Sequence, residues 1–251
     1  MTTLGAPITI GSMQSGTCWQ LIGSTNGYGD AKSDELVTQV ANGRSFQLVT
    51  TFSHGSLQST HLTRIEVRLL EDGYKCWIDL SEIIDRAFSR GPWNPNLLNR
   101  ELIQERIPQV LKWIEQASNQ KNQYLWGGTV GPNFDCSGLV QSAFASQGIW
   151  LPRDAYQQER FCANLQISNL NIQNLLPGDL LFFGTRQKCT HVALYKGQGM
   201  YWHSSGKNNG RNGIGCDGLP MIHKNPVACY YRSQLRGAGR VLQCHDGETL
   251  P

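Results

Sequence analysis

A stretch rich in proline and asparagine at residues 89–104 divides the 251-residue chain into two parts with different patterns. It has no regular hydrophobic period, which is typical of a linker or an extended connection. A chain of this length can form one large domain or two modest ones. We therefore expect a first domain over residues 1–88, a linker over 89–104 and a second domain over 105–236. Residues 237–251 match no pattern and form a tail without an assigned role.

The first domain has the pattern of short β-strands. Segments at residues 36–41, 46–51 and 62–70 are rich in β-branched residues. The dipeptide Asn42-Gly43 marks a turn, and Asp72-Gly73 is a hairpin signal. Short strands separated by such turns predict a small all-β barrel or sandwich.

The second domain begins with helical patterns and continues with strands. Apolar residues recur on one helical face over 107–117, with Pro108 in the expected first turn. A second helix is expected from Cys136, with Asp135 before it as N-cap and Gly148 after it. Apolar segments then predict strands at residues 180–183, 191–195 and 200–204. Helices followed by a sheet predict an α+β fold.

Composition excludes several classes of function. The formal net charge is only +3, and no run of Lys or Arg stands out, so we expect no nucleic-acid partner. No stretch of 18 apolar residues predicts a membrane span, and the first residues do not resemble a secretory signal. We therefore expect a cytoplasmic protein whose eight cysteines are reduced.

Cys136 is the candidate nucleophile. At the start of a helix, a thiol meets unpaired backbone N–H groups and the positive end of the helix dipole. Both should lower its pKa below the ordinary value of about 8.5 and stabilise an oxyanion. The alternative is a buried core thiol, a common role for cysteine. The glycines in the preceding loop (Gly127, Gly128 and Gly131) favour the first interpretation because they permit close backbone approach.

The candidate base is His191, with His203 as the group that orients it. A cysteine nucleophile needs a base that a third group holds in place. The two histidines begin and end a candidate hairpin. A three-residue loop or a bulge at Gly199 would place them directly opposite each other on one face, whereas a plain four-residue loop would put them on opposite faces. His203 as an ordinary strand residue remains the alternative.

A zinc site is a further alternative for this region. Cys189, His191, His203 and Cys216 together offer two sulfurs and two imidazoles. Their spacing does not match a usual zinc motif, so we expect no metal here.

Five motifs in this order resemble the NlpC family of papain-like cysteine peptidases. They are Tyr124-Leu-Trp-Gly-Gly128, Asp135-Cys-Ser-Gly138, Pro152-Arg-Asp-Ala-Tyr-Gln157, Pro177-Gly-Asp-Leu-Leu-Phe-Phe183 and His191-Val-Ala-Leu-Tyr195, with His203 following. The resemblance covers about residues 105–235 and implies a papain-like catalytic domain. The segment Gly73–Ile83 is similar to the end of bacterial SH3-type modules, which implies a small all-β SH3-like barrel before it.

The resemblance also implies roles for single residues. Cys136, His191 and His203 would be catalytic. Tyr124 and the backbone N–H of Cys136 would bind the oxyanion. No metal and no cofactor would be needed.

The overall layout is similar to that of γ-D-glutamyl-L-diamino acid endopeptidases. The resemblance implies a murein stem peptide with a free N-terminal L-Ala as substrate, cut between γ-D-Glu and diaminopimelate or lysine during cell-wall recycling. Ser137, Asp154 and Tyr74 would bind the amino group. Asp154 as a helix cap and Tyr74 as a packing residue remain alternatives. Two other functions also remain open: a secreted hydrolase of intact murein, and a non-catalytic peptidoglycan-binding protein.

Overall fold

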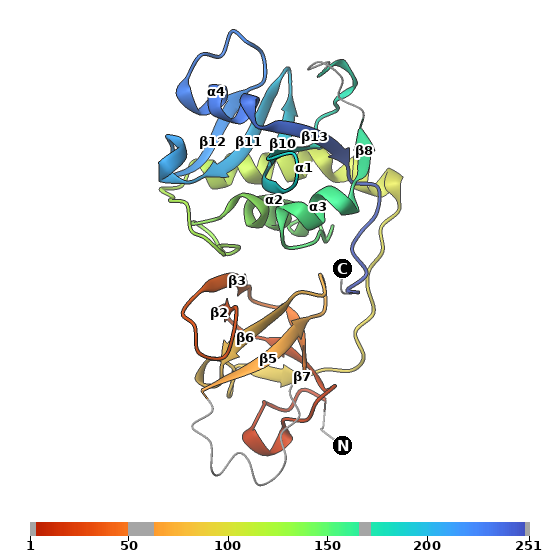
Figure 1. Cartoon of the computed structure of the whole chain (residues 1–251). Helices are drawn as coiled ribbons and strands as arrows, with labels where there is room; N and C mark the ends of the chain where they lie inside the picture. The colour runs from red at the N-terminus through yellow and green to blue at the C-terminus, as the bar shows by residue number, and fades with distance from the viewer. Residues whose placement is uncertain (1–3, 50–62, 166–171, 249–251) are drawn as a thin grey trace. The chain divides into compact units, whose positions relative to one another are not determined.

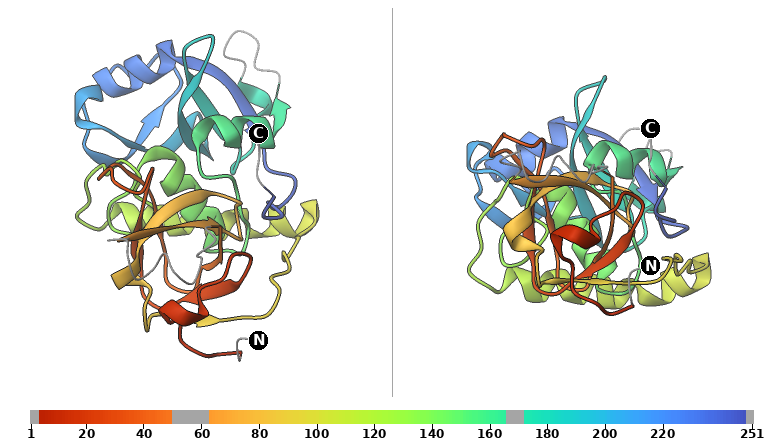
Figure 2. Two further views of the ribbon diagram at one scale, coloured as in Figure 1. Left: turned by 60° about the horizontal axis from the view of Figure 1, so that its bottom comes forward. Right: turned by 90° about the horizontal axis from the view of Figure 1, so that it is seen from below.

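The computed structural model describes residues 4–49, 63–165 and 172–248, and it divides into two compact units (Figures 1 and 2). The first unit comprises Met1–Pro95 together with Asp246–Pro251, and the second comprises Asn96–His245. Each unit has a buried hydrophobic core of its own. None of the helices in these described segments is long and apolar enough to cross a membrane.

The second unit is built on an antiparallel six-stranded sheet with the strand order β12-β11-β10-β9-β13-β8. Its helices are α1 (Arg100–Ser118), α2 (Cys136–Ala145), α3 (Ala155–Phe161) and α4 (Pro226–Ser233). Its strands are β8 (Ala163–Leu165), β9 (Leu180–Gly184), β10 (Cys189–Gly197), β11 (Met200–Ser205), β12 (Gly213–Gly218) and β13 (Leu235–Arg240). Helices and strands therefore occur as expected for an α+β fold.

Alternating side chains of the sheet serve two cores. Phe182 and Val192 pack with residues of α1, α2 and α3, whereas Phe183 and Ala193 pack with Tyr231 of α4. Figure 1 shows α1, α2 and α3 on one side of this sheet and α4 on the other. Because both faces are covered, the central strands are apolar at successive positions, as in the run Leu180–Phe183.

Helix α1 is longer than the sequence pattern predicts. It begins at Arg100, because Asn99 caps it by accepting a hydrogen bond from the Leu102 amide at 2.9 Å. Pro108 therefore lies inside the helix and not in its first turn. The predicted linker over 89–104 is wrong at its end, since its last five residues are helical.

The predicted tail at 237–251 is also wrong at its start. Residues 237–240 belong to β13, which pairs with β9 on one side and with the edge strand β8 on the other. Beyond this strand, Val241 and His245 are buried in the second unit. The chain then enters the first unit, where the Arg68 guanidinium donates to the carbonyl of Gly247 at 3.0 Å.

The first unit contains an antiparallel seven-stranded sheet with the strand order β3-β2-β6-β5-β4-β1-β7. The strands are β1 (Cys18–Leu21), β2 (Thr25–Tyr28), β3 (Leu36–Val40), β4 (Ser45–Leu48), β5 (Arg64–Leu69), β6 (Lys75–Asp79) and β7 (Ala87–Ser89). Three of them confirm the predicted strands as far as the described residues extend, and β5 and β6 form the expected hairpin at Asp72-Gly73. An SH3-like barrel remains a prediction.

Candidate active site

The candidate nucleophile Cys136 is the first residue of α2, as the sequence predicts. Asp135 caps the helix: its Oδ1 accepts from the Gly138 amide at 2.6 Å, and its Oδ2 accepts from the Gly127 amide at 2.9 Å. One carboxylate thus joins the first turn of the helix to the loop before it. This double contact fixes where the thiol stands.

The glycines of this region permit close backbone contact. A Cβ added to Gly138 would lie 2.0 Å from the carbonyl oxygen of Gly128, and one added to Gly128 would lie 2.6 Å from the carbonyl oxygen of Asn133. The first turn of α2 can therefore pack directly on the loop only where both residues lack side chains. The expected role of Gly128 is confirmed.

Arg153 neutralises the buried Asp135 carboxylate. Its guanidinium donates to Asp135 Oδ2 at 2.6 Å and to the Ser137 hydroxyl at 3.0 Å, and only 1% of the residue is exposed. Our sequence reasoning assigned Arg153 no role. A buried carboxylate such as that of Asp135 requires a cation nearby, and this requirement could have pointed to an arginine such as Arg153.

The pKa expected for Cys136 is wrong in direction. Burial, followed by the negative charge of Asp135, raises the pKa of the thiol to about 12. The backbone amides of Val192 and Ser137 lower the pKa, but by less. The thiol is therefore protonated at neutral pH, and it needs a base that takes the proton during attack.

Cys136 lies against the backbone of β10. The amide that acts on its sulfur belongs to Val192, the residue directly after His191. A charge on the sulfur would also act on the pKa of Tyr124 and of Tyr231. Tyr231 stacks on the His191 ring at a centroid distance of 4.2 Å. The thiol, the imidazole and both phenols thus belong to one site.

The two histidines of the hairpin meet on one face of the sheet. His191 Nε2 and His203 Nδ1 are 2.9 Å apart, and both residues are buried. The register shifts between Tyr195 and Gly197, so the bulged register that the hypothesis needs is present. The predicted position of the bulge at Gly199 is wrong, because the extra residue is Lys196. The directly opposed pairing is wrong: by the register of Leu194 with Trp202, His203 faces Ala193, and His191 lies diagonally from it.

His191 is a neutral imidazole. Its burial, followed by the repulsion that a second charge next to His203 would meet, lowers its pKa well below 6.5. Tyr231 holds the ring by stacking, and the Tyr231 hydroxyl is itself 2.7 Å from the Ser205 hydroxyl. A neutral, oriented imidazole can accept a proton from the thiol.

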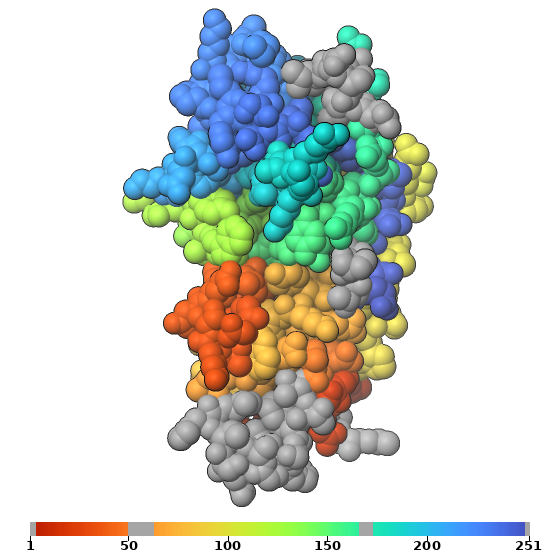
Figure 3. Space-filling model, viewed as in Figure 1, coloured from red at the N-terminus to blue at the C-terminus, as the bar shows by residue number. Residues whose placement is uncertain are grey.

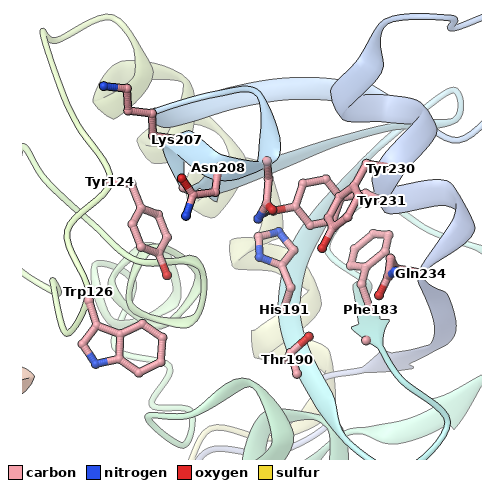
Figure 4. A pocket seen from close by; sticks show the side chains of 13 residues that line it. Tyr124, Trp126, Phe183, Thr190, His191, Lys207, Asn208, Tyr230, Tyr231 and Gln234 are labelled. Carbon is pink, nitrogen blue, oxygen red and sulfur yellow. Dashed lines mark hydrogen bonds between the residues drawn. The ribbon is translucent and has the colours of Figure 1, made fainter.

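A pocket of about 450 Å³ opens beside His191. Figure 4 shows Tyr124 and Trp126 on one side of it, and His191, Tyr231 and Phe183 on the other. The further lining residues are Gly184, Thr190, Gly206, Lys207, Asn208, Asn209, Tyr230 and Gln234. Trp126, with 63% of its surface exposed, forms an aromatic wall of the pocket, and the sequence motifs do not give it a role.

Tyr124 lines the pocket and can donate a hydrogen bond there. Burial, followed by the nearby Cys136, raises the pKa of its hydroxyl far above the usual 10, so the phenol keeps its proton. This state suits the predicted oxyanion role, which remains a prediction, as does the role of the Cys136 amide.

The three residues expected to bind an amino group have different surroundings. Ser137 is buried, and its hydroxyl donates to Asp135 Oδ1 at 3.2 Å. Asp154 is the N-cap of α3 and forms a capping box with Gln157, so its structural role is present. Tyr74 packs against the core of the first unit. Binding of substrate by these residues remains a prediction.

The zinc alternative finds no support in the side-chain arrangement. His203 uses Nδ1 for His191, and its Nε2 also has a protein partner. The Cys189 thiol faces the carbonyl of His191 at 3.5 Å. Over residues 4–49, 63–165 and 172–248, no three His, Cys, Asp or Glu side chains are grouped to hold a metal ion.

Comparison with known proteins places this site in a family. Residues 121–227, less than half of the chain, match the model of the NlpC/P60 family. A segment of 86 residues is 44% identical to the bifunctional muramidase/DL-endopeptidase CwlT of Bacillus subtilis (strain 168), covering 33% of this chain and 25% of that protein. A segment of 84 residues is 39% identical to the gamma-D-glutamyl-L-lysine dipeptidyl-peptidase of the same organism, covering 32% and 27%.

A further relative with a peptidase name and a solved structure of the same family also match. The murein DD-endopeptidase MepS/murein LD-carboxypeptidase of Escherichia coli (strain K12) is 36% identical over 112 residues, which cover 44% of this chain and 54% of that protein. The crystal structure of a NlpC/P60 family protein from Bacillus cereus ATCC 10987 aligns with a TM-score of 0.46 and 22% identity, over 90% of this chain and 64% of that chain. The aligned segments thus span a quarter to a half of the curated relatives. The chain contains a domain of the NlpC/P60 family, with the papain-like mixture of helices and strands.

Proposed function

We propose that this protein is a cysteine peptidase that hydrolyses the bond between γ-D-Glu and a diamino acid in murein stem peptides with a free N-terminal L-Ala. The observation that carries the proposal is the thiol of Cys136 at the start of α2, against the backbone of Val192, the residue that follows the oriented His191 in β10. The family and the printed names of the relatives, which include a gamma-D-glutamyl-L-lysine dipeptidyl-peptidase, support it.

The reaction follows from the protonation states of the two groups. The Cys136 sulfur attacks the γ-glutamyl carbonyl carbon while His191 accepts the thiol proton. The oxyanion accepts hydrogen bonds from Tyr124 and from the backbone N–H of Cys136. His191 then gives its proton to the leaving amine, and a thioester remains. Water, deprotonated by His191, hydrolyses the thioester and restores the thiol.

The pocket suits an anionic peptide. Lys207 lines it with an exposed ammonium group, and a stem peptide carries carboxylates. Trp126 and Tyr124 offer aromatic faces for the aliphatic parts of the chain. We take free stem peptides in the cytoplasm as the substrate, with intact murein as the alternative.

The test is to incubate the protein with L-Ala-γ-D-Glu-L-Lys, with L-Ala-γ-D-Glu-diaminopimelate and with the N-acetylated form of each. We expect release of the diamino acid, detected by mass spectrometry, from the free peptides and not from the acetylated ones. Cys136→Ala is the control and should release none. Intact murein sacculi form a second arm: faster release from sacculi than from free peptides would favour the alternative. No cleavage in either arm would refute the peptidase assignment.

Asp154→Asn tests the predicted amino-group site. Asn is as good an N-cap as Asp, so α3 should keep its capping box while the charge is lost. We expect kcat/KM for the free peptide to fall by about 10- to 100-fold, the effect of losing a charge-assisted contact. An unchanged value would remove Asp154 from the site.

A further inference from the structure

A buried chain of polar contacts continues beyond the two histidines. His203 Nε2 lies 2.8 Å from Asp217 Oδ2, and the Arg211 guanidinium donates to the same oxygen at 2.6 Å. Asp217 is in β12, opposite Tyr201 of β11, and is 1% exposed. The Cys–His–His mechanism leaves this aspartate without a role, and the sequence motifs did not mark it.

We propose that Asp217 is a positioning residue, which fixes the proton on Nε2 of both His203 and His191 so that His191 turns an unprotonated Nδ1 to Cys136. This inference rests on the proposed function for its catalytic consequence. In this proposal the positive charge of Arg211 keeps Asp217 deprotonated, so that its carboxylate can only accept hydrogen bonds.

The assignment of protons follows from the hydrogen bonds. Burial alone would raise the pKa of Asp217, but the hydrogen bond from His203 and the charge of Arg211 hold it below its usual value. The group is thus a carboxylate, which only accepts. His203 must therefore donate from Nε2.

The same reasoning extends to His191. Burial and the charge of Arg211 together lower the pKa of His203 more than Asp217 raises it, so at neutral pH His203 is neutral and its Nδ1 accepts. The partner of that nitrogen is His191 Nε2, at 2.9 Å, which must donate. Nδ1 of His191 is then the nitrogen with the free electron pair. Asp217 thus sets the tautomer of His203, and His203 in turn sets the tautomer of His191.

The Arg211 guanidinium lies in space that is open only because residue 215 is a glycine. A Cβ added to Gly215 would be 2.1 Å from Nη1 of Arg211. Arg211 stands in the loop between β11 and β12, which also brings Lys207 and Asn208 to the pocket and lies at the surface in Figure 3. The ion pair between Arg211 and Asp217 therefore connects the two histidines to a loop that lines the pocket.

The sign of the Arg211 effect can be worked out. The charged and titratable groups around His203 are His191 of β10, Tyr201 of β11, Asp217 of β12, Arg211 of the loop and Tyr231 of α4. Asp217 raises the pKa of His203 and Arg211 lowers it. Without the arginine, His203 would bind a second proton at higher pH. It would then donate from Nδ1 and force the proton of His191 onto the nitrogen that faces the thiol.

The first experiment reads the tautomers directly, by ¹⁵N NMR of the histidine rings, and needs no substrate. In the wild type we expect Nε2–H forms for both His191 and His203. Asp217→Leu, close in shape but without an acceptor, should move both rings toward Nδ1–H. It should lower kcat by about 10²- to 10⁴-fold, the range that a positioned general base contributes, with KM within about threefold.

The second experiment uses the partly exposed Arg211, whose replacement leaves the buried aspartate in place. Arg211→Met should shift the acid limb of the kcat profile to higher pH, and Arg211→Lys should restore it. A merely structural ion pair would change the melting temperature and leave both the limb and the ring signals unchanged.

The outcomes separate this inference from the proposed function. If the wild type cleaves the peptides, but Asp217→Leu keeps kcat within threefold and the wild-type ring signals, the inference is wrong. If the wild type cleaves nothing, but the tautomers are as described and change in Asp217→Leu, the positioning role stands and the proposed substrate is wrong.

Discussion

At the scale of single residues, burial and the helix dipole compete at Cys136. The dipole and the two backbone amides favour the thiolate, and desolvation favours the thiol. Desolvation wins, because only 7% of Cys136 is exposed. The proton must therefore move to His191 as the carbon–sulfur bond forms. This makes the orientation of the imidazole more important than the charge of the free thiol.

The pH dependence of alkylation tests this conclusion. Iodoacetamide reacts with thiolates, and a pKa of about 12 leaves very little thiolate at neutral pH. In a Cys229→Ser background, which removes an exposed thiol, modification of Cys136 should rise about tenfold per pH unit between pH 7 and 10. Mass spectrometry of the Cys136 peptide measures the rate. A constant rate between pH 5 and 8 would instead show a stable thiolate.

Gly138 is the residue at which α2 meets the loop. Gly138→Ala places a methyl group 2.0 Å from the Gly128 carbonyl, and overpacking of this kind costs about 1–3 kcal/mol. Gly237→Ala is the matched control, because a Cβ there meets nothing within 4 Å. Chemical denaturation should show a loss of stability for the first variant only. Equal effects in both variants would show that the loop yields freely.

At the scale of elements, the β10–β11 hairpin decides whether the site exists. Side chains alternate along a strand, so one residue more or fewer in the pairing turns a side chain to the other face. The register shift between Tyr195 and Gly197 supplies the extra residue, which brings His191 to the face of His203. The tip of this hairpin contains Gln198 at a φ of 54°, between two glycines that also have positive φ.

The strain at Gln198 gives a testable ranking. Asn tolerates the left-handed conformation better than Gln, and a β-branched residue tolerates it worse. Gln198→Asn should stabilise the protein by about 0.5 kcal/mol, and Gln198→Val should destabilise it by about 1 kcal/mol. The same pair at Gln39, inside β3, should rank in the reverse order, because β-strands favour Val over Asn. Melting temperatures measure both pairs; the same order at both positions would contradict the explanation.

At the scale of the whole molecule, the two units, each with hydrophobic core residues of its own, predict two unfolding events. Leu48 belongs to the core of the first unit. Leu139 belongs to the core that α1, α2 and α3 form with the sheet of the second unit, and both leucines are buried. Leu→Ala at either position should cost about 3–5 kcal/mol. By calorimetry, Leu48→Ala should lower one transition and Leu139→Ala the other. If each variant shifted both transitions together, the units would unfold as one.

The sequence by itself determined the local features. Asp135 before Cys136 predicted the N-cap, Asp72-Gly73 predicted a hairpin, and the apolar run at 180–183 predicted a buried strand. Each depends on neighbours a few residues away, so the pattern is complete in the printed letters. The five ordered motifs also identified the family of the second domain.

Only the tertiary structure decided the features that depend on distant parts of the chain. The high pKa of Cys136 comes chiefly from its burial in the folded domain, and the partner of His203 comes from β12, 14 residues away in sequence. Residues 237–240, which have no pattern of their own, pair in the sheet because β9 offers them an open edge. Desolvation and strand pairing are sums over neighbours that the fold assembles, and no short stretch of sequence contains them.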